Sequence, residues 1–553
     1  MRKAILTTCL LSVSLTQAQT LYVNNSDNTY QPFDTKKAEM TFNEAQQLVR
    51  IRLADGTISQ FATAMITDIA PVSNSGTKLT YTLSPQISFN ISDASNYSEI
   101  VETIVTDELD DESGDFVENY KPERTITITF SATGVKTSSL PGDITATTKG
   151  GHIVINSMRS NVAYRVTGTC TNGSLKIYST KKFQLMAQNL KLTNPTGPAI
   201  NIQSGKTVYF TLLNGTTNTL CDGGTYSTPE IAADGTEEDQ KGTLFSEGQL
   251  IFNGEGTLNV TSLGGHGICS DDYIRVRSGN INILNAAKDG FRTKDKFIIG
   301  RTASTAPTIT VNATNNGIDC SEGTLTIEAG KLDIKSGSEG IKVEYEEQVP
   351  DPTVIPDAYI KGGFIKIVTT GEKSSAIKTT RNYTQSGGII QATVNGNGSK
   401  IINCDGAVEF AGGKLTGIAN GTISADETSA GGIKSNGNTT ITGGTIAIDC
   451  TGRGSKGINC NGDITVNGGD IILLANAENN TDIADDKKSR AMTAVNIIVN
   501  SGKVVASAYN HALSSTGGII MNGGIVNAYS NTSNALSIDA TQTGGWLQTK
   551  NAE

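Results

Sequence analysis

One short pattern recurs about every two dozen residues between His266 and Val343. A glycine precedes an apolar marker residue, a small residue follows two positions later, and polar or acidic residues come next. The markers lie about 23 to 27 residues apart, at Ile268, Phe291, Ile318 and Ile341. A fixed period in this range, with short alternating strands and Gly, Asn or Asp turns, is typical of a solenoid. Because one repeat is too short to bury its own apolar side, the repeats must stack on one another.

The same pattern predicts the domain organisation. Weaker markers continue at Ile377, Ile402, Ile433, Ile458, Met492, Leu513 and Leu536. Sixty glycines and a single Trp in 553 residues fit a chain of many tight turns and thin β layers. We therefore expect an all-β chain with a solenoid of stacked rungs over residues 123–545, the region for which the resemblance described below implies a parallel β-helix. Residues 19–122 should form a smaller β-rich region, with a hairpin around Asp55-Gly56.

The first 18 residues have the features of an export signal. Arg2 and Lys3 form a basic start, Ile5 to Leu15 an apolar centre, and Ala18 ends a small-residue cleavage site. In the alternative interpretation Cys9 is a lipidated N-terminus. No later stretch is apolar enough for a membrane span. The expected location is the periplasm, the cell surface or the outside of the cell.

Charge and cysteine placement exclude some classes of partner. A net charge of −10 and a pI near 5.1 argue against nucleic acid, because phosphate contacts require a broad basic surface. The same acidity is compatible with hard cations. Cys320, Cys404 and Cys460 each fall two residues after a marker, so we expect them to point inward as small buried side chains rather than to form disulfides.

Stacking turns the repeat into geometry. Parallel rungs lie about 4.8 Å apart, so residues at equal offsets from the marker form columns. The marker and its second neighbour should point inward, and the residue between them outward. The outward column then reads Arg292, Asp319, Lys342, Lys378 and, further on, Lys434. It is either a solvated face or a basic stripe that meets the carboxylates of an acidic sugar chain, with Arg292, and Lys294 near it, among the binding residues.

Acidic residues flank this column on both sides. Stacked carboxylates repel unless a cation or water separates them, and all-oxygen ligands suit Ca²⁺. Calcium ligands are therefore predicted at six positions, and the alternative is a set of solvated turn residues: Asp272, Asp289, Asp295, Asp319, Glu322 and Glu339. A separate acidic run, Asp107 to Asp115, is expected to be a solvated loop, with a calcium loop as the alternative.

Support for catalysis is weak, and no catalytic residue is assigned. The three histidines, His152, His266 and His511, lie far apart in the sequence and form no known catalytic spacing. A calcium-dependent polysaccharide lyase would need only an Arg or Lys base beside the metal, and Arg292 or Lys294 could serve. A surface adhesin or structural spacer is the other alternative to a binding protein.

Several segments together resemble a known family. GEGTLNV, HGICSDDYIRV, KDGFRTKDKFII, NNGIDCSEGTLTIEAGKLDI and SEGIKV are similar to the exported bacterial carbohydrate-binding β-helix family formerly described as a domain of unknown function. The resemblance is close from about Thr125 to Tyr345 and weaker to about Ile538. It implies a right-handed, single-stranded parallel β-helix that binds cellulose or acidic plant polysaccharides such as polygalacturonate, with calcium at acidic turns and no firmly established catalytic activity.

The family's DG-x-R-x-K-D motif falls here on Asp289, Gly290, Arg292, Lys294 and Asp295. Where related proteins often have Asp-Gly before the first marker, this chain has His266-Gly267, so one acidic ligand is missing at that rung. We expect an exported, monomeric, non-catalytic solenoid that binds an acidic or cellulosic polysaccharide with the help of calcium.

Overall fold

The computed structural model describes residues 20–79, 113–232, 235–300, 305–345, 353–477 and 483–551. The export signal and most of the acidic run lie outside these residues. The chain divides into two compact units. The central unit comprises residues 90–407 and 413–416, and the terminal unit comprises residues 1–89, 408–412 and 417–553.

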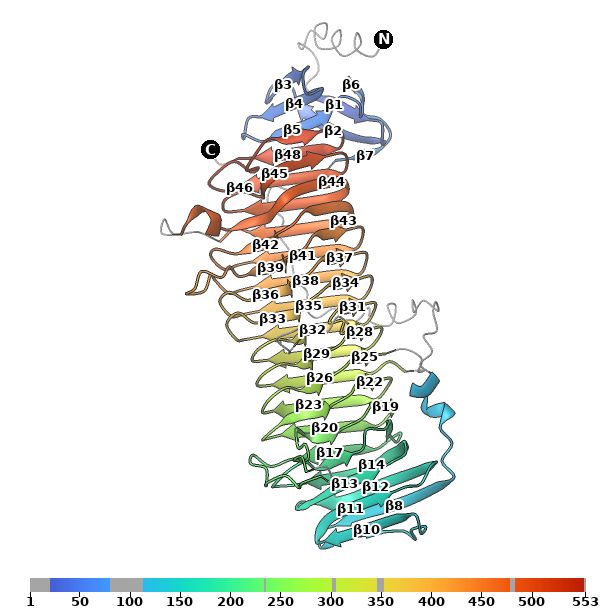
Figure 1. Cartoon of the computed structure of the whole chain (residues 1–553). Helices are drawn as coiled ribbons and strands as arrows, with labels where there is room; N and C mark the ends of the chain where they lie inside the picture. The colour runs from blue at the N-terminus through green and yellow to red at the C-terminus, as the bar shows by residue number, and fades with distance from the viewer. Residues whose placement is uncertain are drawn as a thin grey trace. The chain divides into compact units, whose positions relative to one another are not determined.

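Parallel rungs of three short strands build the central unit. From β15 (Ile200–Gln203) onward, each strand of this unit pairs in parallel with the strand three places further along the chain, so three sheets run up the unit (Figure 1). The first sheet contains β13 (Gly173–Ser179), β15 (Ile200–Gln203), β18 (Gly242–Ser246), β21 (His266–Ser270), β24 (Phe291–Thr293), β27 (Ile318–Cys320), β30 (Ile341–Val343), β33 (Ser375–Thr379) and β36 (Lys400–Cys404).

The other two sheets follow the same rule. The second sheet contains β16 (Val208–Leu212), β19 (Leu250–Gly254), β22 (Ile274–Val276), β25 (Phe297–Ile299), β28 (Leu325–Ile327), β31 (Ala358–Ile360) and β34 (Tyr383–Gln385). The third sheet contains β17 (Thr217–Cys221), β20 (Thr257–Ser262), β23 (Asn280–Ala286), β26 (Thr308–Ala313), β29 (Lys331–Ser336), β32 (Phe364–Thr369) and β35 (Ile389–Val394). The predicted all-β parallel β-helix is confirmed.

The core explains the glycine before each marker. All the markers from Ile268 to Ile377 are completely buried between the three sheets. A Cβ at Gly317 would lie 2.3 Å from Cγ2 of Ile334, on the third sheet, and 2.5 Å from the carbonyl oxygen of Gly340 on the next rung. Larger side chains from the opposite wall fill the space that a side chain at this position would need.

Two antiparallel strand pairs and two short turns also belong to the central unit. Antiparallel pairs, β8 (Arg124–Ser131) with β9 (Gly134–Thr137) and β10 (Ile144–Lys149) with β11 (Gly151–Ser157), lie at its first rungs. Two 3₁₀ turns, η2 (Ser113–Asp115) and η3 (Val117–Asn119), lie against the outside of the second sheet. We call residues 113–120 the strap.

Asp115 corrects one expectation from the sequence. The acidic run that contains it was expected to be a solvated loop, but Asp115 is only 4% exposed. Its carboxylate accepts a 2.8 Å hydrogen bond from Nη1 of Arg275, which is itself buried. Tyr273 also donates its hydroxyl hydrogen to Asp115. The end of the acidic run is therefore a buried partner for an arginine.

The terminal unit continues the parallel pattern. Its rungs contain β37 (Val408–Phe410), β39 (Gly431–Ser435), β40 (Thr439–Ile441), β41 (Thr445–Cys450), β42 (Lys456–Cys460), β43 (Ile464–Ala475), β44 (Arg490–Ala508), β45 (Leu513–Met521), β46 (Ile525–Ser530), β47 (Ala540–Gln542) and β48 (Trp546–Lys550).

The N-terminal strands cover the last of these rungs. β3 (Ala38–Asn43), β4 (Leu48–Leu53) and β5 (Ile58–Ala62) are antiparallel, and β5 pairs with β48. A second sheet of β6 (Ile66–Ala70), β1 (Thr20–Asn25), β2 (Thr29–Asp34) and β7 (Thr77–Lys78) packs on them. The predicted hairpin is confirmed between β4 and β5, where Gly56 has a φ of +82°.

Other expectations concern cysteines and membrane spans. Cys320, Cys404 and Cys460 are buried free thiols, as predicted. Within the described ranges no helix is long and apolar enough to cross a membrane.

Candidate functional site

The register of the first sheet places the predicted outward residues over one another. Arg292 is paired across the sheet with Asp319, Asp319 with Lys342, and Lys342 with Lys378. Each lies between an inward marker and an inward small residue, because side chains alternate along a strand. We call these four residues the charged column, and its existence confirms the predicted stacking of the repeat.

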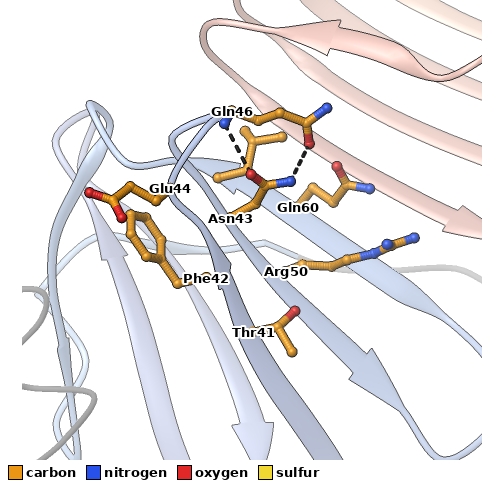
Figure 2. Close-up of a pocket in the computed structure, with 8 residues that line it drawn as sticks. Thr41, Phe42, Asn43, Glu44, Gln46, Arg50 and Gln60 are labelled. Atoms are coloured by element: carbon orange, nitrogen blue, oxygen red, sulfur yellow. Dashed lines mark hydrogen bonds between the residues drawn. The ribbon is translucent and has the colours of Figure 1, made fainter.

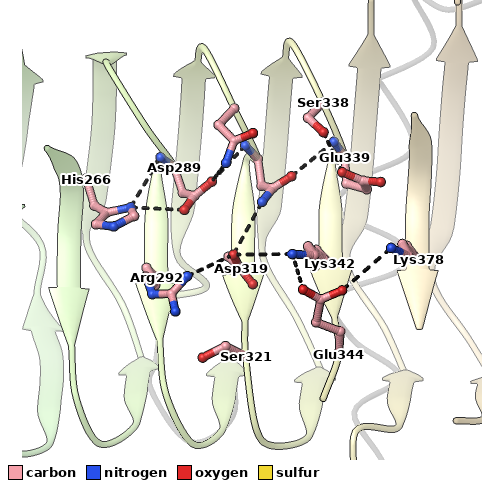
Figure 3. Close-up of polar contacts among 12 residues, drawn as sticks. His266, Asp289, Arg292, Asp319, Ser321, Ser338, Glu339, Lys342, Glu344 and Lys378 are labelled. Atoms are coloured by element: carbon pink, nitrogen blue, oxygen red, sulfur yellow. Dashed lines mark hydrogen bonds and ion pairs between the residues drawn. The ribbon is translucent and has the colours of Figure 1, made fainter. Parts of the chain in front are cut away.

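The column is an alternating ladder of ion pairs (Figure 3). Nη1 of Arg292 lies 3.3 Å from Oδ2 of Asp319, and Nζ of Lys342 lies 4.0 Å from the same oxygen. Glu344, in the next outward column, contacts Lys342 and lies 3.5 Å from Nζ of Lys378. The sequence emphasised the basic residues and missed Glu344. Glu344 follows the end of β30 directly, and its position two residues after Lys342 places it on the same side of the chain, which is the signal that could have found it.

Asp319 is the buried centre of this ladder. It is 2% exposed, Asn316 donates an amide hydrogen to Oδ2 over 3.3 Å, and Oδ1 has no hydrogen-bond partner among the described residues. Burial raises the pKa of Asp319 to about 6, although Lys342 and Arg292 favour its charged form; Asp289 adds to the rise. Desolvation therefore outweighs the two cations.

Asp289 occupies the neighbouring column with His266. Nδ1 of His266 lies 3.0 Å from Oδ2 of Asp289, while Oδ1 accepts hydrogen bonds from Nδ2 of Asn315 at 2.7 Å and the backbone N–H of Asn316 at 2.9 Å. Burial alone would raise the pKa of Asp289, but the contacts with His266 and Asn316 lower it below its usual value. His266 thus supplies a partner for Asp289 at the rung where the resemblance led us to expect another acid.

The six predicted calcium ligands separate into two places. Asp289, Asp319 and Glu339 lie on the face of the first sheet, where Ser338 donates to Glu339 over 2.5 Å. The others lie at the turns that follow the strands: Asp272, Asp295 and Glu322. Over the part of the chain that is described, neither set brings three carboxylate oxygens within 4.8 Å of one another.

The turn residues have partners of their own. The backbone N–H of Asp295 donates to the carbonyl of Asp272 at 3.0 Å, so the two acids lie on consecutive rungs. Burial raises the pKa of Asp295; Lys296 opposes the rise and Asp272 adds to it. Glu322 lies 3.6 Å from Nζ of Lys294, whose side chain is 55% exposed. Lys294 is therefore the most accessible of the four predicted sugar-binding cations.

A third acidic group was not predicted. Carboxylate oxygens of Asp239, Glu247 and Asp271 lie within 4.8 Å of one another. Nζ of Lys241 pairs with Asp239 at 2.9 Å and Asp271 at 2.5 Å. Burial raises the pKa of Glu247 to about 7, and Asp271 and Asp239 add to the rise. Glu247 and Asp271 occupy successive rungs, which periodicity could have shown, whereas Asp239 comes from an irregular excursion that periodicity cannot place.

That excursion, from Tyr226 to Lys241, limits where the charged column begins. Lys176 on β13 pairs with its Glu230 and Glu238 at 2.9 and 2.8 Å. Further along the first sheet, the outward residues Phe245 and Cys269 are fully buried. The excursion itself forms an open pocket of about 460 Å³. The outward residues change from buried and apolar to charged at Arg292, where an extended ligand would have free access to the sheet.

The pKa of Asp319 gives a testable prediction for stability. An acid with a raised folded-state pKa favours the folded protein below its unfolded value of 3.8, and this stability is lost as pH rises to about 6. Relative to Asp319→Asn, the free energy of unfolding of the wild type should therefore fall by about 1 kcal/mol per pH unit between pH 4 and 6. Denaturant unfolding of both proteins in chelator-containing buffer measures the difference, and a flat difference would contradict the raised pKa.

The chain is similar to known proteins in sequence and in structure. A sequence-family model described as "carbohydrate-binding domain-containing protein" matches residues 149–479, more than half of the chain. Among curated proteins, none matches. A solved structure titled as a polysaccharide lyase-like protein from C. thermocellum is similar at 20% identity and a TM-score of 0.37, covering 52% of this chain and 96% of that one. A likeness of this size says nothing about activity.

Proposed function

The chain belongs to the carbohydrate-binding domain-containing family, and from this premise we propose that the first sheet binds an acidic polysaccharide along the charged column. The matched residues 149–479 include every residue of that column. The carrying observation is the register, which places Arg292, Lys342 and Lys378 in one line on one face. Cations in a line at rung spacing complement a linear polymer that carries a carboxylate on each sugar.

The internal ion pairs set how such binding works. Asp319 is buried, so it keeps its ion pairs with Arg292 and Lys342 when the polymer binds. A carboxylate of the polymer must therefore approach Arg292 or Lys342 from the solvent side. These side chains are 26% and 18% exposed, so a ligand can reach part of each from solvent. An arginine that holds one carboxylate can still present its remaining N–H groups to another. The binding is therefore polar, and its affinity should fall with salt.

Calcium is the second part of the proposal. We assign it to the six acids of the sequence pattern, where it would bridge protein and polymer carboxylates. The donor set fits a hard cation in kind, because it is all oxygen, and Oδ1 of Asp319 is buried without a partner among the described residues. The group formed by Asp239, Glu247 and Asp271 is an alternative position, where Lys241 would have to move aside.

Affinity gels test both parts together. We expect the full chain to be retarded in gels that contain polygalacturonate, less at high salt, and less again when a chelator replaces calcium. Asp289→Ala with Asp295→Ala should abolish the calcium effect, and Asp271→Asn should preserve it. Retardation that is the same with calcium and with chelator would show that binding does not require calcium. Equal retardation in a gel of a neutral glucan would contradict the proposed preference for an acidic polysaccharide.

The same incubation distinguishes binding from cleavage. A binding protein leaves the polymer intact, whereas a lyase releases unsaturated sugars that absorb in the ultraviolet. We expect no increase in absorbance. Export to the periplasm, cell surface or outside of the cell remains part of the proposal, and it is tested by the N-terminal sequence of the mature protein, which should begin after Ala18.

A further inference from the structure

The wall of the terminal unit extends beyond its last rung. On β48, Leu547 is buried and lies in register with Val526 on the rung before it. Its other neighbour is Gln60 on β5, which lies opposite Arg50 on β4, and Arg50 lies opposite Thr41 on β3. One column thus changes from apolar to polar at the strand where the rungs end.

The two faces of these added strands differ. Val49, Phe61 and Trp546 lie on the other face and form an apolar core with Val23 and Phe33 of the second N-terminal sheet. That core accounts for the stability of the added strands. The face that carries Thr41, Arg50 and Gln60 is mixed, because Leu48 and Ala62 on the same face are buried.

A pocket of about 410 Å³ opens on this polar face. Its lining residues are Thr41, Phe42, Asn43, Glu44, Gln46, Leu48, Arg50 and Gln60. Figure 2 shows the Asn43, Arg50 and Gln60 side chains on one side of the strands, and Phe42 and Glu44 directed to the other. The only carboxylate in the lining therefore points away from the arginine.

Asn43 and Gln46, at one edge of the pocket, hold each other in place. Nδ2 of Asn43 donates to Oε1 of Gln46 at 2.7 Å, and Oδ1 of Asn43 accepts from the backbone N–H of Gln46 at 3.1 Å. Arg50 is exposed and has no ion-pair partner among the residues that the structure describes. An unpaired guanidinium beside amides and a hydroxyl matches a ligand that carries one carboxylate and several hydroxyls.

We infer that this pocket is a second binding site, for a single carboxylate-bearing sugar unit held by Arg50 with Thr41 and Gln60. The choice of an acidic sugar rests on the proposed function, but the pocket does not depend on the charged column. It lies outside residues 149–479, which the family model matches.

Calorimetric titration of the full chain with a short oligogalacturonide tests the inference. The wild type should bind two equivalents and Arg50→Gln one, with at least about tenfold weaker binding at the pocket, as expected for a lost charge-assisted hydrogen bond. Arg52→Gln is the matched control, because Arg52 lies two residues along β4, opposite Glu39 and outside the pocket lining. It should still bind two equivalents.

Two further arms make every outcome decisive. Competition with acetate or with galactose tests whether the carboxylate or the sugar hydroxyls are sufficient alone. We expect neither compound to displace the oligogalacturonide well. A variant with Arg292, Lys342 and Lys378 changed to Gln should retain the pocket equivalent. If it retains both equivalents, the charged column fails and the pocket stands. If Arg50→Gln retains both, or Arg52→Gln loses one equally, the pocket is overturned.

Discussion

Replacing Asp115 with Ala should lower the free energy of unfolding by about 3–5 kcal/mol, because a charged Arg275 would remain buried without its carboxylate. The two side chains are 6% and 1% exposed and are joined over 2.8 Å. Further hydrogen bonds hold the strap against the second sheet, over the Asp115–Arg275 pair. The hydroxyl of Tyr120 donates to the carbonyl of Val162 at 3.0 Å, and Tyr209 donates to the carbonyl of Gly114 at 2.5 Å.

Matched variants identify the cause of such a loss. Asp143→Ala removes an aspartate from an exposed pair with Arg159, with side chains 42% and 32% exposed, and should cost no more than about 1 kcal/mol. Adding Arg275→Met to Asp115→Ala should recover part of the loss, since no buried charge remains. Urea unfolding of the four proteins measures these differences. An Asp115→Ala protein within about 1 kcal/mol of the wild type would mean that the strap does not stabilise the central unit.

Changing Arg292, Lys342 and Lys378 to Gln should weaken polygalacturonate binding about 1,000-fold or more. Each lost charge-assisted contact removes about 1.5–3 kcal/mol, and about 1.4 kcal/mol corresponds to a factor of ten. The matched control changes the same number of charges elsewhere: Lys331 and Lys335 on the third sheet, and Lys361 after the second. Retardation in polygalacturonate gels, with thermal melting to verify folding, measures both variants.

The control variant separates the effect of where the charges lie from the effect of the net charge on polymer affinity. It should bind within about threefold of the wild type, because distant charges are screened at physiological salt. Lys378→Gln alone leaves Asp319 with its two cations, so it weakens binding without disturbing the buried acid. Equal losses in the triple variant and in its control would show that only the overall charge matters.

The repeat could be predicted from the sequence because its period is visible in residues only about two dozen positions apart. Ile268, Phe291, Ile318 and Ile341 define the register, and the register fixes that Arg292, Asp319 and Lys342 lie on one face. The buried free thiols of Cys320 and Cys404 follow from the same alignment. A strand's alternation and a rung's spacing are enough for these inferences, since each rung contacts only its neighbours.

What the sequence could not supply comes from contacts without a period. Asp115 and Arg275 are 160 residues apart, and no repeat relates them. Asp239 reaches Asp271 through an irregular excursion, and β5 meets β48 from the opposite end of the chain. The pairing of Asp289 with His266 lay within reach, because the two share a column on consecutive rungs. Whether the six acids bind calcium remains a prediction.

The most direct test of the account is a lysine-labelling footprint of the full chain with and without polygalacturonate. Acetylation followed by mass spectrometry reads each lysine separately. Lys378 lies on the first sheet and Lys294 directly after its strand β24, whereas Lys331 and Lys335 lie on the third sheet. The account predicts that the polymer slows labelling of Lys294 and Lys378 and leaves Lys331 and Lys335 unchanged. Protection of the third-sheet lysines instead, or no protection at all in a chain that binds the polymer, would place the ligand elsewhere.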